Sequence, residues 1–115
     1  MIDSVVAQTF DNWELCLVND CSTDPAITSL LDAAARSDKR IKVVHRSENG
    51  GIIAASADAL AMATGDFVAL LDHDDLLNEV ALASFVEVLG MHPDIDYSYS
   101  DEAHLTPSGQ IVTPF

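Results

Sequence analysis

Three short apolar runs alternate with helix-like segments along the chain. Residues 13–19 (WELCLVN), 41–45 (IKVVH) and 66–72 (DFVALLD) have the length and composition of strands that are buried on both faces. Between them, residues 25–36 carry apolar side chains at helical spacing, and residues 51–65 are rich in alanine. This order predicts an α/β fold with a mostly parallel sheet and right-handed crossovers.

Capping residues mark the ends of the predicted helices. Asp24 is suited to the N-cap of the first helix and Pro25 to its first position. Gly65 can end the second helix in the left-handed conformation, and Asn78 can begin a third helix that Pro93 stops. The remainder is predicted as a fourth strand over 96–101 and a hairpin over 104–112 that turns at residues 107–109.

Size and composition fit one globular domain over residues 1–115. Hydrophobic residues make up 49% of the chain, and no apolar run approaches the roughly 20 residues of a membrane span. The net charge of −14, with five Lys and Arg in all, gives a surface that repels nucleic acid and anionic membranes. In an extended chain Cys16 and Cys21 lie on the order of 15 Å apart, too far for a disulfide. With no secretion signal at the N-terminus, we expect a reduced, cytoplasmic protein, any membrane association coming from other parts of a parent protein.

Two acidic clusters follow predicted strands. NDCSTD (19–24) comes after the first strand and DHDD (72–75) after the third. The carboxyl ends of parallel strands meet at one edge of a sheet, where ligands gather. Asp72 and Asp74 are suited to Mg²⁺ or Mn²⁺, which also binds phosphate oxygens. Such a cation would relieve the repulsion among these carboxylates and let an acidic protein hold a diphosphate.

The DHDD stretch is also compatible with roles that involve no nucleotide. One alternative is a solvated turn whose aspartates cap the next helix. Another is a phosphatase aspartate pair, against which the sequence DLL (75–77) argues, because such a nucleophile is usually followed by a small hydroxyl residue. A calcium EF-hand is a poor match, because Leu77 and Ala83 stand where that loop needs Gly and Glu. His73 either touches a metal or points away from it.

Asp20 and the segment NGG (49–51) each allow two interpretations. Asp20 either accepts a hydrogen bond from a base or ribose, or caps the following helix. The backbone of residues 49–51 either faces an anion at the start of a helix or forms a plain turn.

Taken together, the motifs resemble those of a known enzyme family. In order, SVVAQTFDNWELCLVNDCSTD, ENGGIIAASADALAMATGDFVALLDHDD and YSDE resemble the nucleotide-sugar-binding half of family 2 glycosyltransferases. The resemblance covers nearly the whole chain. It implies a glycosyltransferase with the three-layer α/β GT-A fold, a Rossmann-like nucleotide-diphospho-sugar transferase fold with a mostly parallel sheet, here truncated.

The resemblance also implies roles for the residues that match its motifs. Asp20 matches the aspartate that faces the nucleotide base, and Asn49 and Gly51 match the loop beside the nucleotide. The metal motif, which implies Mn²⁺ or Mg²⁺, matches three acids: Asp72 near the ribose and the cation, Asp74 on the cation, and the additional acid Asp75.

Other positions depart from the family or lack its usual surroundings. Cys21 replaces the usual Gly, Asn19 the usual first Asp, and Ser56 an Arg that would contact the diphosphate. Asp101 and Glu102 match an acidic pair on the acceptor side, whereas the usual catalytic base belongs to a C-terminal half that this chain lacks. The family's first strand is also absent, so we interpret the chain as a fragment of a transferase with little or no activity alone.

The implied function is inverting transfer of a sugar from a nucleotide diphosphate sugar, with a UDP-sugar as the expected donor, to a glycan or other hydroxyl acceptor in cell-surface polysaccharide or glycan synthesis. A non-catalytic nucleotide- and metal-binding module, a metal-dependent phosphohydrolase and a plain interaction domain are the alternatives.

Without the first strand, the strands at 13–19 and 66–72 expose unpaired backbone edges. We therefore expect a homodimer or another rearranged assembly.

Overall fold

The computed structural model describes residues 1–106 and 108–112, which form two compact units. The first unit comprises residues 1–83 and the second residues 84–115. Each unit is described by itself below. Within the described residues, no helix has both the length and the apolar character needed to cross a membrane.

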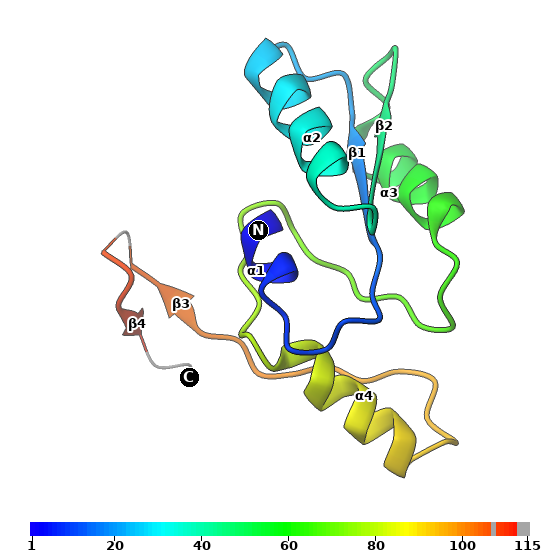
Figure 1. Ribbon diagram of the computed structural model, residues 1–115, viewed down its shortest axis with the longest axis vertical. Helices are drawn as coiled ribbons and strands as arrows, with labels where there is room; N and C mark the ends of the chain where they lie inside the picture. The colour runs from blue at the N-terminus through cyan, green and yellow to red at the C-terminus, as the bar shows by residue number, and fades with distance from the viewer. Residues whose placement is uncertain (107, 113–115) are drawn as a thin grey trace. The chain divides into compact units, whose positions relative to one another are not determined.

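The first unit is a small layered α/β structure (Figure 1). It contains α1 (Ile2–Val6), β1 (Leu15–Asn19), α2 (Pro25–Ser37), β2 (Ile41–His45) and α3 (Gly51–Met62). β1 and β2 pair in parallel, with Leu15 opposite Ile41 and Asn19 opposite His45. α2 and α3 lie on opposite sides of this two-stranded sheet, so the predicted α/β class and the parallel pairing are confirmed.

The apolar core of this unit is small. Among the described residues, the buried hydrophobic side chains are those of Val5, Leu17 and Ile41. The buried Asn19 side chain adds polar contacts to this small core. Its Nδ2 lies 3.2 Å from both Thr28 Oγ1 and His45 Nδ1. Hydrogen bonds therefore supply much of what fixes α2 against the sheet.

Residues 77–82 are anchored to the N-terminal segment that follows α1 and not to the sheet. The buried Gln8 side chain donates from Nε2 to the Asn78 carbonyl (2.7 Å) and accepts at Oε1 from the Leu82 N–H (3.0 Å). The Thr9 N–H donates to the Glu79 carbonyl at 2.9 Å. These contacts fix the chain downstream of the DHDD stretch to the residues just after α1.

One of the predicted helix ends is confirmed and another is wrong. Asp24 caps α2, because its carboxylate accepts from the Ala26 N–H at 2.8 Å and Pro25 follows it. α3, by contrast, ends at Met62 with Ala63 as its C-cap, so the prediction that Gly65 ends it in the left-handed conformation is wrong. Gly65 instead donates its N–H to Glu14 Oε1 at 3.1 Å.

Glu14 fixes the carboxyl end of α3 to the start of β1. Its carboxylate pairs with Lys42 and accepts from the Thr64 N–H and hydroxyl. Lys42 in turn donates to the Met62 carbonyl at 3.0 Å, one of the last carbonyls of α3. The hydrogen bond from Lys42, followed by that from Thr64, lowers the pKa of the Glu14 carboxyl to about 2.

The predicted strand over 66–72 is wrong. These residues are irregular, and Phe67 and Leu70 are 61% and 91% exposed. Their composition suits a strand, but a strand forms only when a neighbour supplies hydrogen-bond partners. Among the described residues, β1 pairs with β2 alone, so residues 66–72 have no such neighbour.

The second unit contains most of α4 (Ala81–Met91) and a short hairpin. β3 (His104–Leu105) and β4 (Ile111–Val112) pair antiparallel, as predicted, and Gly109 adopts φ +79° in the turn. Residue 107, at the start of the predicted turn, lies outside the described residues. The predicted strand over 96–101 is wrong, because these residues form no ladder.

We predict that the acid sensitivity of the fold depends on Glu14. Its folded-state pKa lies below the ordinary 4.5, so its ionised form stabilises the fold above about pH 4.5, and this contribution is lost as the pH falls toward 2. Urea unfolding of Glu14→Gln should therefore show a smaller loss of unfolding free energy between pH 5 and pH 2.5 than the wild type. The exposed Glu87→Gln serves as the control and should keep the wild-type slope. Equal slopes for all three proteins would contradict this role.

Candidate functional site

A carboxylate at the end of β1 holds the first turn of α3. Asp20 accepts from the Gly50 N–H at 2.9 Å and from the Gly51 N–H at 2.7 Å. Asn49 Nδ2 donates to the Asp20 carbonyl at 3.0 Å, so three predicted site residues are brought together. Asp20 does not cap α2, the helix that follows it; it supplies the side-chain cap that Gly50, the N-cap of α3, lacks.

Arg46 completes this cluster, and sequence reasoning missed it. Its Nε lies 3.5 Å from Asp20 Oδ1 and 3.4 Å from Asp58 Oδ2. A Cβ on Gly50 would lie 2.8 Å from both terminal guanidinium nitrogens, so the guanidinium group occupies the space beside that glycine. Nη1 is buried with no hydrogen-bond partner among the described residues. The available signal was a basic residue directly after a strand in a chain with only five Lys and Arg.

The DHDD stretch forms an exposed turn. The Asp75 N–H donates to the Asp72 carbonyl at 3.2 Å, and residues 72–75 are all exposed. His73 is 93% exposed, with Nδ1 3.9 Å from Asp74 Oδ1. Within the described parts of the chain, no three His, Cys, Asp or Glu side chains are grouped to hold a metal ion.

The chemistry of this turn nevertheless fits a divalent cation. Mg²⁺ is commonly bound by one or two carboxylates together with substrate phosphates and waters, so a cage built by the protein alone is not required. Asp72, Asp74 and Asp75 offer such carboxylates to solvent, in contrast to Asp20, whose oxygens are already engaged by backbone N–H groups.

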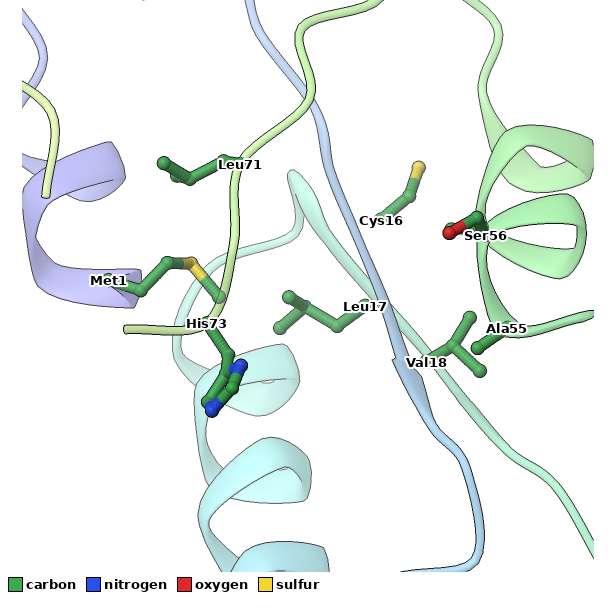
Figure 2. Close-up of a pocket in the computed structure, with 9 residues that line it drawn as sticks. Met1, Cys16, Leu17, Val18, Ala55, Ser56, Leu71 and His73 are labelled. Atoms are coloured by element: carbon green, nitrogen blue, oxygen red, sulfur yellow. The ribbon is translucent and has the colours of Figure 1, made fainter. Parts of the chain in front are cut away.

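A pocket of about 190 Å³ lies beside β1 (Figure 2). Cys16 and Val18 line it from the side of β1 that faces α3, and Ala55 and Ser56 from α3 itself. His73 lines the same pocket, so the DHDD turn lies beside the carboxyl half of β1. Burial raises the pKa of the Cys16 thiol, and both cysteines are free, as predicted.

Asp101 and Glu102 belong to the second unit, where both are exposed just before β3. Their predicted role on the acceptor side stays a prediction.

The arrangement agrees with the comparison to known families. Residues 1–103 match the profile described as glycosyl transferase family 2. The chain belongs to glycosyl transferase family 2. The α/β layering with parallel β1 and β2 is the part of the family's GT-A fold that the structure shows.

Relatives of this family member are much longer than the chain. It is 48% identical over 109 residues to a protein of Sinorhizobium fredii named "Uncharacterized protein y4gI", covering 95% of this chain and 12% of that protein. It is 35% identical to "O-antigen biosynthesis protein RfbC" of Myxococcus xanthus, covering 97% of this chain and 9% of the relative. It is 36% identical to "Bifunctional glycosyltransferase pgtA" of Dictyostelium discoideum, covering 83% and 13%. The chain thus spans about a tenth of the length of these relatives.

One departure from the family motif coincides with a strained backbone conformation. Cys21, where the motif usually has Gly, adopts φ +61°, a conformation that strains a residue with a Cβ. Its Sγ lies 3.6 Å from the Ser47 carbonyl, a weak contact that offsets little of this strain. The loop after β1 therefore keeps a glycine-like path without a glycine.

We predict that Cys21→Gly stabilises the chain by roughly 0.5–1 kcal/mol, because relief of left-handed strain of about 1–2 kcal/mol exceeds the entropic cost of about 0.5–1 kcal/mol for Gly. Urea unfolding followed by circular dichroism measures the difference. Cys21→Ala is the matched control, since it removes the sulfur but keeps the strain, and should not stabilise. Stabilisation by alanine alone would show that the thiol, and not the backbone, is the source.

We predict that Asp20→Ala lowers the free energy of unfolding by about 1–2 kcal/mol, because the first turn of α3 loses its side-chain cap. Asp20→Asn should cost less, since its amide oxygen still accepts one N–H. The exposed Asp66→Ala should change stability by no more than about 0.5 kcal/mol. Equal losses for positions 20 and 66 would mean that the cap contributes nothing.

Proposed function

We propose that the protein to which this chain belongs transfers a sugar from a nucleotide diphosphate sugar, with UDP as the expected nucleotide, to a hydroxyl of a glycan during synthesis of a cell-surface polysaccharide. Inversion at the anomeric carbon and dependence on Mn²⁺ or Mg²⁺ are part of this proposal. Membership of family 2 supports the reaction class, and the O-antigen name of one relative supports the polysaccharide context.

One structural observation carries the donor-site part of the proposal. His73 of the DHDD turn and Val18 of β1 line the same pocket, and the Asp20 cluster begins two residues beyond Val18. The two acidic clusters that the sequence placed at strand ends are thus held in one unit. A nucleotide needs this combination of a backbone-lined loop for its base and ribose and exposed carboxylates for its cation.

Within this proposal the acids of the DHDD turn and Asp20 have different tasks. Asp72 and Asp74 would hold the cation, with Asp75 as an additional ligand, and the bound cation would stabilise the negative charge that develops on the departing diphosphate. Asp20 keeps Asn49 and Gly51 in place, so that the loop beside the nucleotide is set before the donor binds. The catalytic base is proposed to lie elsewhere in the parent protein.

We predict that Asp74→Asn weakens the binding of UDP in the presence of Mn²⁺ by at least about tenfold, or about 1.4 kcal/mol. The substitution keeps the size of the side chain but removes the charge that attracts the cation. Isothermal titration calorimetry measures the effect, with EDTA added to show that the wild-type affinity depends on metal. The exposed Asp94→Asn is the control for net charge and should bind UDP as the wild type does.

Three outcomes would count against the proposal. Unchanged affinity in Asp74→Asn would remove Asp74 from the cation site. Release of free phosphate by the parent protein, without sugar transfer, would favour the phosphohydrolase alternative. Metal-dependent UDP binding by a parent protein that neither transfers nor hydrolyses would favour a binding module.

A further inference from the structure

We propose that the segment SVVAQT (4–9) positions the DHDD turn for its cation, with the amide of Gln8 as the positioning group. This inference rests on the proposed function, because the cation belongs to the donor site described there. The segment carries no charged side chain, so it acts on a cation through the placement of other groups.

The side chain of Gln8 is buried, at 4% exposed, and its amide is fully engaged. Its Nε2 donates to the carbonyls of Ser4 (3.0 Å) and Asn78 (2.7 Å), and its Oε1 accepts from the Leu82 N–H (3.0 Å). The Leu82 N–H lies in the first turn of α4, where backbone donors have no partner within the helix. A carboxamide suits this place, because it offers two donors and an acceptor on one uncharged group.

Ser4 and Thr9 extend this contact on either side of Gln8. Ser4 Oγ accepts from the Leu77 N–H at 3.2 Å. The Thr9 N–H and Oγ1 both donate to the Glu79 carbonyl, at 2.9 and 3.2 Å. The segment thereby holds the stretch of chain that leads into α4.

The held residues begin directly after the acidic turn. Leu77 follows Asp75 by two positions, so their Cα atoms lie within about 7 Å of each other whatever path Leu76 takes. The turn itself is closed by the Asp75 N–H, which donates to the Asp72 carbonyl at 3.2 Å. The anchor at Leu77 and this closure together limit how far the carboxylates of the turn can move.

Such an anchor affects cation binding through conformational entropy. A cation that draws several carboxylates together also bears the cost of fixing the backbone that carries them. When neutral hydrogen bonds fix that backbone in advance, the cost is removed from the binding step. Because Gln8 is uncharged, it leaves the charge of the turn unchanged. Gln8 therefore contributes order to the turn, whereas Asp74 contributes charge.

Isothermal titration calorimetry of UDP in the presence of Mn²⁺, on the full chain, tests this role. Gln8→Met keeps a side chain of similar length but removes all three hydrogen bonds, and should bind UDP about tenfold more weakly than the wild type. Ile41→Val is the control for stability, since it thins the core at a buried position of β2, and should keep the wild-type affinity. A loss of equal size in Ile41→Val would overturn the proposal, because reduced stability alone would then account for it.

A second measurement reports on the turn in the absence of ligand. In Gln8→Met the backbone amide heteronuclear NOE of residues 72–75 should fall. That of residues 49–51 should stay at the wild-type value, because Asp20 holds them. A purely structural role of Gln8 would lower stability and leave residues 72–75 as ordered as in the wild type, and this outcome would overturn the proposal.

A milder pair of variants applies where Gln8→Met fails to fold. Ser4→Ala removes the oxygen that accepts from the Leu77 N–H, the anchor nearest the turn, and should weaken UDP binding about threefold. Ser29→Ala removes a hydroxyl with a similar local bond from an exposed position of α2, and should bind UDP as the wild type does. Equal affinities of these two variants would overturn the proposal.

The wild type separates failure of this inference from failure of the proposed function. Absence of Mn²⁺-dependent UDP binding by the wild type would overturn the proposed donor site, and the role of Gln8 with it. Metal-dependent binding that is lost in Asp74→Asn but kept in Gln8→Met would overturn the role of Gln8 alone.

Discussion

The bond between Asp20 and the first turn of α3 is the interaction on which the rest of the first unit depends. A sheet of two strands cannot cover two helices with apolar surface alone, and the buried hydrophobic side chains of the described residues are few. Residues that flank β1 therefore fix α3 at both ends, Asp20 at its amino end and Glu14, with Lys42, near its carboxyl end. Polar contacts do here what a larger core does elsewhere. The geometry of the loop beside the proposed nucleotide follows from this arrangement, because the same carboxylate that anchors the helix sets residues 49–51.

The acidic residues fall into two groups according to the groups that they contact. Asp20, Glu14 and Asp38 are engaged by backbone N–H groups or by cationic side chains, and the Arg40 guanidinium beside Asp38 lowers the pKa of that carboxyl. These acids already have their counter-charges and are poor candidates for a metal. Residues 72–75 differ, since they are exposed and, within the part of the chain that the structure describes, contact no Lys or Arg side chain; His73 Nδ1 lies 3.9 Å from Asp74 Oδ1. Uncompensated carboxylates that are close in sequence remain ionised together only in water or beside a cation, which is why this turn, and not the acid-rich surface in general, is the candidate site.

The features that sequence predicted correctly are those decided within a few residues. The cap at Asp24 and the hairpin around Gly109 each depend on local backbone preferences. The strand at 41–45 formed because β1 lies beside it as a partner. The strands predicted at 66–72 and 96–101 failed because a strand is completed by a partner that lies elsewhere, and composition cannot show whether that partner is present. The residues of the candidate site also differ in whether the sequence reveals their partners. The pairing of Asp20 with residues 49–51 joins segments about thirty positions apart through a shared sheet edge, which the predicted topology supplied. Arg46 was missed because its partners are set by the path of two loops, which no periodicity encodes.

The irregular residues 67–71 and the acidic turn at 72–75 are parts of one continuous segment, so the order of the first affects the second. Residues 67–71 lead directly into Asp72, so pairing of this segment with a strand would fix the backbone from which the carboxylates proposed to bind the cation project. Fixing one residue's backbone costs about 1–2 kcal/mol, and a cation that binds an already ordered turn does not bear that cost itself. By linkage, the cation then favours the paired strand to the same extent that the strand favours the cation. A turn that follows an unpaired segment is therefore expected to bind the proposed cation more weakly than a turn that follows a paired strand, so the order of residues 67–71 contributes to the proposed donor site together with the aspartates.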